Sequence, residues 1–292
     1  MSKFYQFDPE EAIRIIRKDW NIFHNKMIDT VPHTNDPYPG FRYVIGISGG
    51  KDSLVAAALA KKEFGADKVI GVLMPNGEQA DIKDSIRICD EVLGIKRIEI
   101  NIAKAFMDLT YQFFHQVHLT SRDTDINLPP RLRMATLYMV AQSMQGIVVN
   151  TCNLSEDMVG YATLYGDNAG SYAPLKNLTV TEIRKIGDAL GLPHELVYKT
   201  PADGLQDNSD EDHLGLTYAS IDDYIRFGSE AVPAEIASKI DAKYKANKFK
   251  LDMVRIEGPE FPYPNYVVTN NEPIPKPPPT AEEVLSDCSG IH

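Results

Sequence analysis

Apolar runs rich in β-branched residues alternate with helical patterns along much of this chain. Between the runs, apolar residues recur at the three- and four-residue spacing that places them on one face of a helix. Strands separated by helices need crossover connections, so we expect an α/β fold with an open parallel sheet and helices on both of its faces. The runs that predict strands are residues 43–47, 68–74, 97–102 and 146–150.

Capping signals mark helices on either side of this alternation. Asp8 precedes a proline and an apolar face that recurs at helical spacing through Phe23, which predicts an N-terminal helix. Thr179 and Glu182 have the spacing of a capping box, and Gly191 is expected to end the helix that they begin. Further helices are expected over residues 218–227 and 234–245.

The amino-acid composition indicates the cellular compartment of the protein and the kinds of partner that it can bind. The 292 residues carry a formal net charge of −11, which argues against a nucleic-acid partner because phosphate backbones bind lysine and arginine. The three cysteines are widely spaced and suggest neither a disulfide framework nor a zinc site, and no apolar stretch is long enough to cross a membrane. We expect a cytoplasmic protein without membrane contact, in which residues 1–258 form a single domain and residues 259–292 a proline-rich C-terminal tail.

Residues 48–53, with the sequence Ser-Gly-Gly-Lys-Asp-Ser, join the first predicted strand to a helical pattern. Glycines lack a Cβ atom, so the backbone there can approach an anion closely. The helix that follows directs unpaired N–H groups and the positive end of its dipole at the same point. This arrangement predicts a phosphate-binding loop.

The spacing within this loop distinguishes among the known phosphate-binding loops. A Walker A loop needs glycine, four residues, then Gly-Lys and a hydroxyl residue, but here Asp52 follows Gly50-Lys51 and Ile45 stands at the first glycine position. The dinucleotide fingerprint Gly-x-Gly-x-x-Gly fails as well. The pattern Ser-Gly-Gly-x-Asp-Ser resembles the PP-loop of the ATP pyrophosphatases, which implies cleavage of ATP between its α and β phosphates and transfer of AMP to an acceptor.

Two other predicted strands lead into loop segments, at 74–77 (Met-Pro-Asn-Gly) and at Asn150-Thr151. Ligands of open parallel sheets bind beyond the carboxyl ends of the strands. We therefore expect these two segments and the phosphate-binding loop to converge on one crevice.

Downstream segments extend the resemblance to a particular family. Residues 71–79, 127–134, 150–156, 166–167, 174–179, 210–215 and 221–224 resemble successive segments of NAD synthetase. That family joins ammonia to nicotinic acid adenine dinucleotide (deamido-NAD), converting ATP to AMP and pyrophosphate. The resemblance implies a Rossmann-like fold of the adenine nucleotide alpha hydrolase type. It also implies a ligase that forms a carbon–nitrogen bond through an adenylated carboxylate, with Mg²⁺ as cofactor and ATP as co-substrate.

The same resemblance assigns roles to individual residues. Lys51 and Asp52 would be catalytic, and Asp52 and Glu156 would hold Mg²⁺, a cation that takes few protein carboxylates beside phosphate oxygens. The residues that would contact deamido-NAD are Arg131, Asp167 and Lys250. The residues that would contact ATP are Gly46, Ile47, Ser48, Gly49, Gly50, Lys51, Asp52, Ser53, Gln79 and Thr151.

Several of these residues also have a purely structural interpretation. Lys51 could be a solvated surface lysine, and Glu156 an acid in the first turn of a helix. Arg131 could be an exposed charge on a helix that follows Pro129-Pro130, and Asp167 a turn residue.

The chain departs from the family pattern at several basic positions. Leu164 and Val180 stand where lysines are expected, and Ala202 stands where a threonine is expected. Near the C-terminus, Lys248-Phe249-Lys250 replaces a cluster of histidine, lysine and arginine, which leaves Lys250 as the expected ligand. These replacements indicate either a branch that holds the dinucleotide differently or a changed acceptor.

The ammonia source and the assembly are also expectations. Glutamine-using relatives carry an additional glutaminase domain, and the residues before the first predicted strand are too few to hold one, so we expect direct use of ammonia. The resemblance implies a homodimer with the dinucleotide near the subunit interface. Two alternatives stay open: another PP-loop ligase, such as a tRNA-modifying or GMP-forming enzyme, and a nucleotide-binding protein without catalysis.

Overall fold

The structure, a computed structural model, describes residues 6–28, 41–79, 82–199 and 210–252. The chain divides into two units, Met1–Asp252 and Met253–His292. The proline-rich segment from residue 259 lies outside the described residues, and the domain boundary at 258 stays a prediction.

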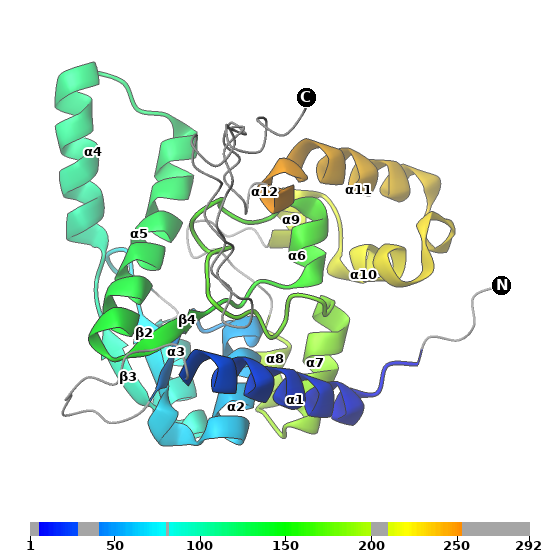
Figure 1. The fold of residues 1–292 in the computed structure, drawn as a ribbon. Helices are drawn as coiled ribbons and strands as arrows, with labels where there is room; N and C mark the ends of the chain where they lie inside the picture. Colours follow the sequence, from blue (N-terminus) through cyan, green and yellow to red (C-terminus); the bar gives the residue numbers. More distant parts are fainter. Residues whose placement is uncertain (1–5, 29–40, 80–81, 200–209, 253–292) are drawn as a thin grey trace, which may run out of the picture. The chain divides into compact units, whose positions relative to one another are not determined.

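Parallel strands form a sheet with helices around it (Figure 1), and the strand order in the described residues is β3-β2-β1-β4. The register places Val44 of β1 opposite Ile70 of β2 and Val148 of β4. The predicted strand 97–102 ends early, but Ile100 still donates a backbone hydrogen bond to the last residue of β2, and Ile102 donates one to the chain that follows β2. The strands are β1 (Arg42–Gly46), β2 (Val69–Leu73), β3 (Lys96–Glu99) and β4 (Gly146–Val149).

Helices surround this sheet in the described part of the chain. They are α1 (Pro9–Ile28), α2 (Lys51–Phe64), α3 (Ile82–Arg87), α4 (Ala103–Val117), α5 (Arg122–Ser143), α6 (Leu154–Val159), α7 (Val180–Ala189), α8 (His194–Val197), α9 (Asp210–Leu214), α10 (Tyr218–Phe227), α11 (Ala234–Asn247) and α12 (Phe249–Asp252), with short helices η1 (Ala66–Lys68), η2 (Ile88–Leu93) and η3 (Ser229–Ala231).

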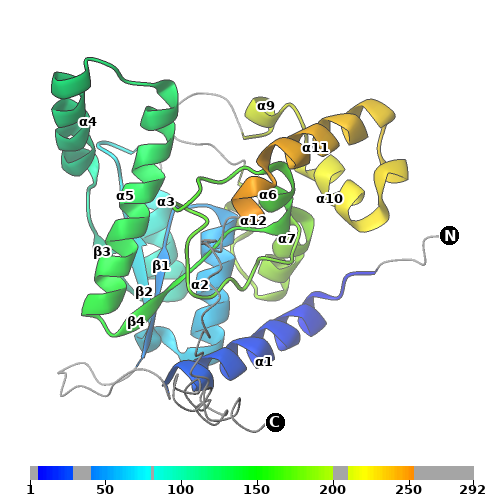
Figure 2. The same ribbon diagram turned by 45° about the horizontal axis from the view of Figure 1, so that its top comes forward.

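Successive side chains of a strand point to opposite faces of the sheet, so the apolar side chains are divided between two cores. Tyr43 and Ile45 of β1 pack with α1, α2 and α7, whereas Val44 packs on the other face with Val140 of α5. Figure 2 shows α2 and α5 on opposite sides of the strands. The predicted α/β fold, with a parallel sheet and helices on both faces, is confirmed.

Local sequence signals predicted the ends of three helices correctly. The carboxylate of Asp8 accepts hydrogen bonds from the amides of Glu10 (3.0 Å) and Glu11 (3.2 Å) at the start of α1. Thr179 and Glu182 form the predicted capping box at the start of α7. Helix α10 has the predicted bounds.

The helix that carries Arg131 begins earlier than the sequence predicts. It does not follow the prolines: α5 begins after Ser121, whose side chain accepts from the amide of Thr124, and it continues through Pro129 and Pro130. Prolines remove N–H donors from the carbonyls one turn earlier. Those carbonyls belong to residues 125 and 126, which are exposed, so water can bond to them.

A third group of buried side chains joins α6, α7, α10 and α11, and it contains Val159, Val180, Tyr218, Ile221 and Ile240. It lies against the carboxyl side of the sheet through α6, which follows β4. None of the helices in the described ranges is both long and apolar enough to span a membrane.

Candidate active site at the carboxyl ends of the strands

Residues 47–50 connect β1 to α2 in a loop closed by its own side chains. The hydroxyl of Ser53 donates to the carbonyl of Gly50 (3.0 Å) and accepts from the amide of Ser48 (3.3 Å). The amide of Gly50 donates to the hydroxyl of Ser48 at 3.3 Å. The first N–H groups of α2 have no acceptor inside the helix, so they are available to an anion above the loop.

Backbone geometry favours glycine at Gly49, and little space is free beside Gly46. Gly49 has a φ of 85°, and a Cβ atom there would lie 3.2 Å from the hydroxyl oxygen of Ser85. At Gly46, the last residue of β1, a Cβ atom would lie 3.3 Å from Cε of Met74. Ile47, which follows Gly46, still donates a backbone hydrogen bond to β2. The loop therefore lies close to the neighbouring strand end, as predicted.

Lys51 is buried, with 4% of the residue exposed, so its interpretation as a solvated surface lysine is wrong. Its ammonium nitrogen lies 2.9 Å from Oδ2 of Asp52 and 5.5 Å from the centre of the Tyr218 ring. Burial disfavours the charge, but the carboxylates of Asp52 and Glu156 outweigh it and raise the pKa of Lys51. Lys51 is therefore a fixed cation among acidic groups.

Glu156 lies in the first turn of α6 and forms a capping box with Asn153. Burial and the charge of Asp52 raise the pKa of Glu156 well above its ordinary value. A second positive charge would relieve this penalty. The structural interpretation of Glu156 as a first-turn acid is thus correct, and it does not conflict with a role in holding a cation.

The predicted substrate residues gather around the loop 160–167. Nε of Arg131 donates to the carbonyl of Leu164 (3.2 Å), and Nζ of Lys250 donates to the carbonyls of Gly160 (2.7 Å) and Ala162 (2.9 Å). The side chains of Arg131 and Lys250 therefore bind the backbone of the loop 160–167.

Asp167 serves partly as a turn residue, since its carboxylate accepts from the amide of Thr163 at 2.7 Å. Its charge also acts on Glu156 and Lys250, so the loop and the carboxylate cluster are electrostatic neighbours. Arg131 is exposed on α5, as its structural interpretation expected.

Thr151 and Gln79 lie in the loops that follow β4 and β2, at the predicted edge of the sheet. The carbonyl of Gln79 accepts from the amide of Ile82 (3.3 Å) at the start of α3. Their ATP contacts stay predictions.

The replaced basic positions differ in their surroundings. Val180 is fully buried in the core of α6, α7 and α10, so it contributes no polar group to the site. Leu164 offers its backbone carbonyl to Arg131. Ala202 lies outside the described residues.

Two cationic side chains lie near the site at positions for which the sequence analysis predicts no role. Nε of Arg133 donates to the carbonyl of Met74 (3.0 Å), directly after β2; burial lowers the pKa of Arg133, although Asp167 opposes this. Nζ of Lys199 lies 2.6 Å from the carboxylate of Asp84, whose Cβ atom would lie 3.4 Å from a Cβ atom at Gly49. Arg133 belongs to a recognised segment, but no local pattern points to Lys199.

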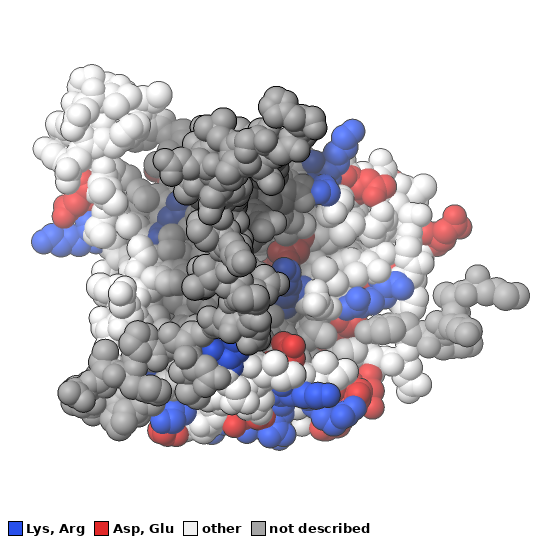
Figure 3. All heavy atoms as spheres, in the orientation of Figure 1, with Lys and Arg blue, Asp and Glu red and all other residues white. Residues whose placement is uncertain are grey.

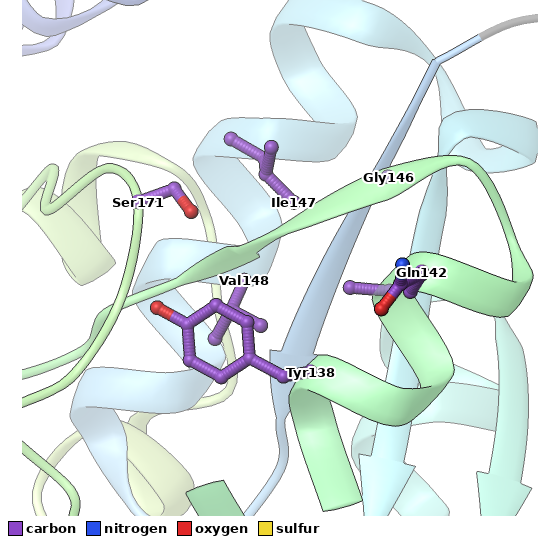
Figure 4. A pocket seen from close by; sticks show the side chains of 7 residues that line it. Tyr138, Gln142, Gly146, Ile147, Val148 and Ser171 are labelled. Carbon is purple, nitrogen blue, oxygen red and sulfur yellow. The ribbon is translucent and has the colours of Figure 1, made fainter. Parts of the chain in front are cut away.

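A shallow pocket of about 260 Å³ lies elsewhere, between α5 and the start of β4. Figure 4 shows Tyr138 and Gln142 beside Gly146, Ile147 and Val148. Gly146 is the first residue of β4, so this pocket lies at the opposite end of the strand from Thr151 and does not belong to the candidate active site.

A Ser-Gly-Gly-x-Asp-Ser loop at the carboxyl end of a parallel sheet, with helices on both faces, defines an α/β protein of the PP-loop class. The family model described as NAD synthase matches residues 26–255. The chain therefore belongs to the NAD synthase family.

Individual relatives agree with this assignment. The chain is 41% identical to the NH3-dependent NAD+ synthetase of Pyrococcus furiosus over 183 residues, which cover 62% of this chain and 70% of the relative. The solved NMN synthetase of Francisella tularensis matches with a TM-score of 0.74 and 30% identity, over 88% of this chain and 100% of that one. The NH3-dependent NAD synthetase of Campylobacter jejuni shares the fold, with a TM-score of 0.66 and 22% identity over 87% of this chain and 100% of that one.

Proposed function

We propose that this protein is an ATP-dependent ligase that amidates deamido-NAD with ammonia to give NAD, AMP and pyrophosphate. The observation that carries the proposal is the cluster of Lys51, Asp52 and Glu156 beside a PP-loop, in a chain of the NAD synthase family. The P. furiosus relative, named as ammonia-dependent, supports ammonia as the nitrogen donor.

The chemistry explains why such a loop is needed. A carboxylate resists attack by ammonia because its oxygen is a poor leaving group. A carboxylate oxygen of the substrate attacks the α-phosphorus of ATP, and the bond from that phosphorus to the oxygen of the leaving pyrophosphate breaks. Ammonia then attacks the carbonyl carbon of the mixed anhydride, AMP departs with the bonding electrons, and the nitrogen loses a proton.

The chain's own groups would stabilise the departing pyrophosphate. The loop amides and the first N–H groups of α2 are already oriented, so they cost no rearrangement during the reaction. Removing one such donor typically lowers the rate by about 10²–10³-fold. The ammonium of Lys51 is held in place by Asp52 and adds a fixed charge.

Mg²⁺ fits the acidic pair of Asp52 and Glu156, because both offer hard carboxylate oxygens and a bound cation would offset the burial that raises the pKa of Glu156. Among the described residues, no group of three or more His, Cys, Asp or Glu side chains could hold a metal ion by itself. Phosphate oxygens would therefore complete the coordination. When bound, the ion would neutralise negative charge on the phosphates.

A second acceptor, nicotinic acid mononucleotide, deserves a direct comparison with deamido-NAD. The NMN synthetase of F. tularensis is matched over its entire length. The buried Val180 and the apolar Leu164 leave the site with fewer cations than the family pattern has, which suits an acceptor with fewer phosphate groups.

Incubation with ATP, Mg²⁺ and ammonium, with each acceptor in turn, tests both candidates. Chromatography would follow AMP, pyrophosphate and the amide. We expect equal amounts of AMP and NAD from deamido-NAD. Formation of ADP, or of no amide with either acceptor, overturns the proposal. A larger kcat/KM with the mononucleotide assigns the second acceptor instead.

We further infer a homodimer that uses α4. No residue of this helix is buried, and Met107, Tyr111, Phe114 and Val117 are exposed; Tyr111 has 64% of its surface exposed. Figure 3 shows no Lys, Arg, Asp or Glu at the C-terminal end of α4, which lies at the upper left. Contiguous exposed apolar side chains mark contact sites.

Analytical sedimentation tests this inference. The wild type should have a mass of twice 32.6 kDa, and Phe114→Glu should have the mass of the monomer. A monomeric wild type contradicts the inference.

We also propose a cytoplasmic location. The described cysteines, Cys89 and Cys152, are free thiols, which fits a reducing compartment. Fractionation of the source cells would test it, and recovery outside the cytoplasm would contradict it.

A further inference from the structure

The side chain of Asn153 contacts both acidic residues of the candidate metal site. Its Nδ2 donates to Oδ1 of Asp52 (3.3 Å), and its Oδ1 accepts from the amide of Glu156 (3.0 Å). The carboxylate of Glu156 accepts in return from the amide of Asn153 (3.1 Å). Asn153 is fully buried, so these contacts are sheltered from water.

The two oxygens of Asp52 therefore have different partners. Oδ1 accepts from Asn153, and Oδ2 accepts from the ammonium of Lys51 at 2.9 Å. Asp52 and Asn153 are separated by 101 positions in the sequence, so this contact ties the start of α2 to the start of α6. A carboxylate bound at both oxygens has a defined orientation.

The capping box of α7 provides a comparison within the same fold. There a hydroxyl residue, Thr179, occupies the position of Asn153, and Glu182 occupies the position of Glu156. Glu182 is paired with Arg226 (2.6 Å), so that carboxylate is neutralised by the protein. A hydroxyl group is sufficient to cap a helix. The amide of Asn153 adds a donor that reaches Asp52, which capping does not need.

We propose that Asn153 is a positioning residue that holds Asp52 and Glu156 in one arrangement for a divalent cation. The proposal rests on the proposed metal site and explains why asparagine caps α6. Residues that orient metal ligands typically contribute about 10–100-fold to metal affinity.

Exchanging the two capping residues separates this role from capping. Asn153→Thr gives α6 the cap that already works in α7, and it removes the donor to Asp52. Thr179→Asn is the matched control, because it makes a similar change in a capping box whose glutamate is paired with Arg226. The probe is Mn²⁺, measured by electron paramagnetic resonance in the presence of α,β-methylene-ATP, which resists α–β cleavage. Circular dichroism and thermal unfolding verify the folds.

We expect the Mn²⁺ dissociation constant to rise about 10–100-fold in Asn153→Thr and to stay at the wild-type value in Thr179→Asn. In turnover assays the Mg²⁺ concentration that gives half of the maximal rate should rise in Asn153→Thr and stay at the wild-type value in Thr179→Asn. Asn153→Ser makes the same test if the threonine variant does not fold. Unchanged Mn²⁺ affinity in a folded variant overturns the role of Asn153. Failure of the wild type to bind Mn²⁺ overturns the metal site itself, and this proposal with it.

Discussion

The ammonium nitrogen of Lys51 lies 2.9 Å from Oδ2 of Asp52, although the two residues are neighbours in the sequence and begin the same helix. Both side chains are largely shielded from water: 4% of Lys51 and 18% of Asp52 are exposed. The PP-loop thus carries its own ion pair directly behind the glycines that would receive phosphate.

Lys51→Met should destabilise the protein when divalent cations are absent. The change leaves the carboxylates of Asp52 and Glu156 without their nearest cation, and breaking a buried pair typically costs about 3–5 kcal/mol. Because Asp52 keeps some contact with water, we expect a loss of about 3 kcal/mol in urea unfolding. Mg²⁺ with ATP should restore part of it. Lys62→Met, at an exposed position of the same helix, is the control, and equal losses in both variants would contradict the prediction.

Asp52→Asn should abolish turnover and leave the fold intact. Asparagine has nearly the same shape and keeps an acceptor oxygen, but it removes the charge that pairs with Lys51 and would bind the metal ion. We expect kcat to fall by at least about 10²–10³-fold, measured as pyrophosphate release, with an unchanged circular dichroism spectrum. Asp67→Asn, at an exposed position of η1, should retain full activity. Activity near the wild-type level in Asp52→Asn would remove Asp52 from the metal site.

Adjacent glycines of the loop should respond differently to alanine. Gly49 has a φ of 85° and is crowded by Ser85, so Gly49→Ala should lower the free energy of unfolding by about 1–2 kcal/mol and weaken ATP binding. Gly50 has an extended backbone with φ −93°, and a Cβ atom there would lie at an ordinary 3.4 Å from the hydroxyl of Ser48. Gly50→Ala should therefore fold with nearly wild-type stability. Thermal unfolding and calorimetric ATP titration measure both effects, and equal losses of stability would contradict this reasoning.

Features of the fold that depend on nearby residues were predictable from the sequence. The capping box of Thr179 and Glu182 spans four residues, and the glycine loop is a contiguous segment whose geometry follows from the absence of Cβ atoms. The start of α5 differs from the prediction, because the helix is capped at Ser121 and continues through Pro129-Pro130.

Features of the site that depend on distant residues were not predictable. The pair of Lys199 and Asp84 is separated by 115 positions, and the contact between Asn153 and Asp52 by 101. No sequence pattern encodes such contacts, since they result from how α6 packs against the start of α2 and how the chain after α8 packs against α3. The burial of Lys51 has the same origin: its cover includes Tyr218, which belongs to α10.

His24 should make stability fall with acidification. Its Nδ1 lies 2.7 Å from the hydroxyl of Tyr43, and its ring packs 4.8 Å from that of Phe64, so burial, with a smaller contribution from the charge of Lys68, lowers the pKa of His24 below its ordinary 6.5. A histidine with a lowered pKa in the folded state favours folding fully above pH 6.5, and this contribution is lost as the pH falls from 6.5 through the folded pKa.

Urea unfolding of wild type and His24→Gln at pH 8 and at pH 5 isolates this contribution. Other groups titrate equally in both proteins, including the carboxyls of Glu156 and Asp222, whose raised pKa values act in the opposite direction. The variant loses packing at every pH, so the informative quantity is the difference in stability between the two proteins. That difference should shrink at pH 5, because only the wild type then has a charge to bury beside Phe64. An unchanged difference for His24→Gln would show that protonation of His24 does not oppose folding.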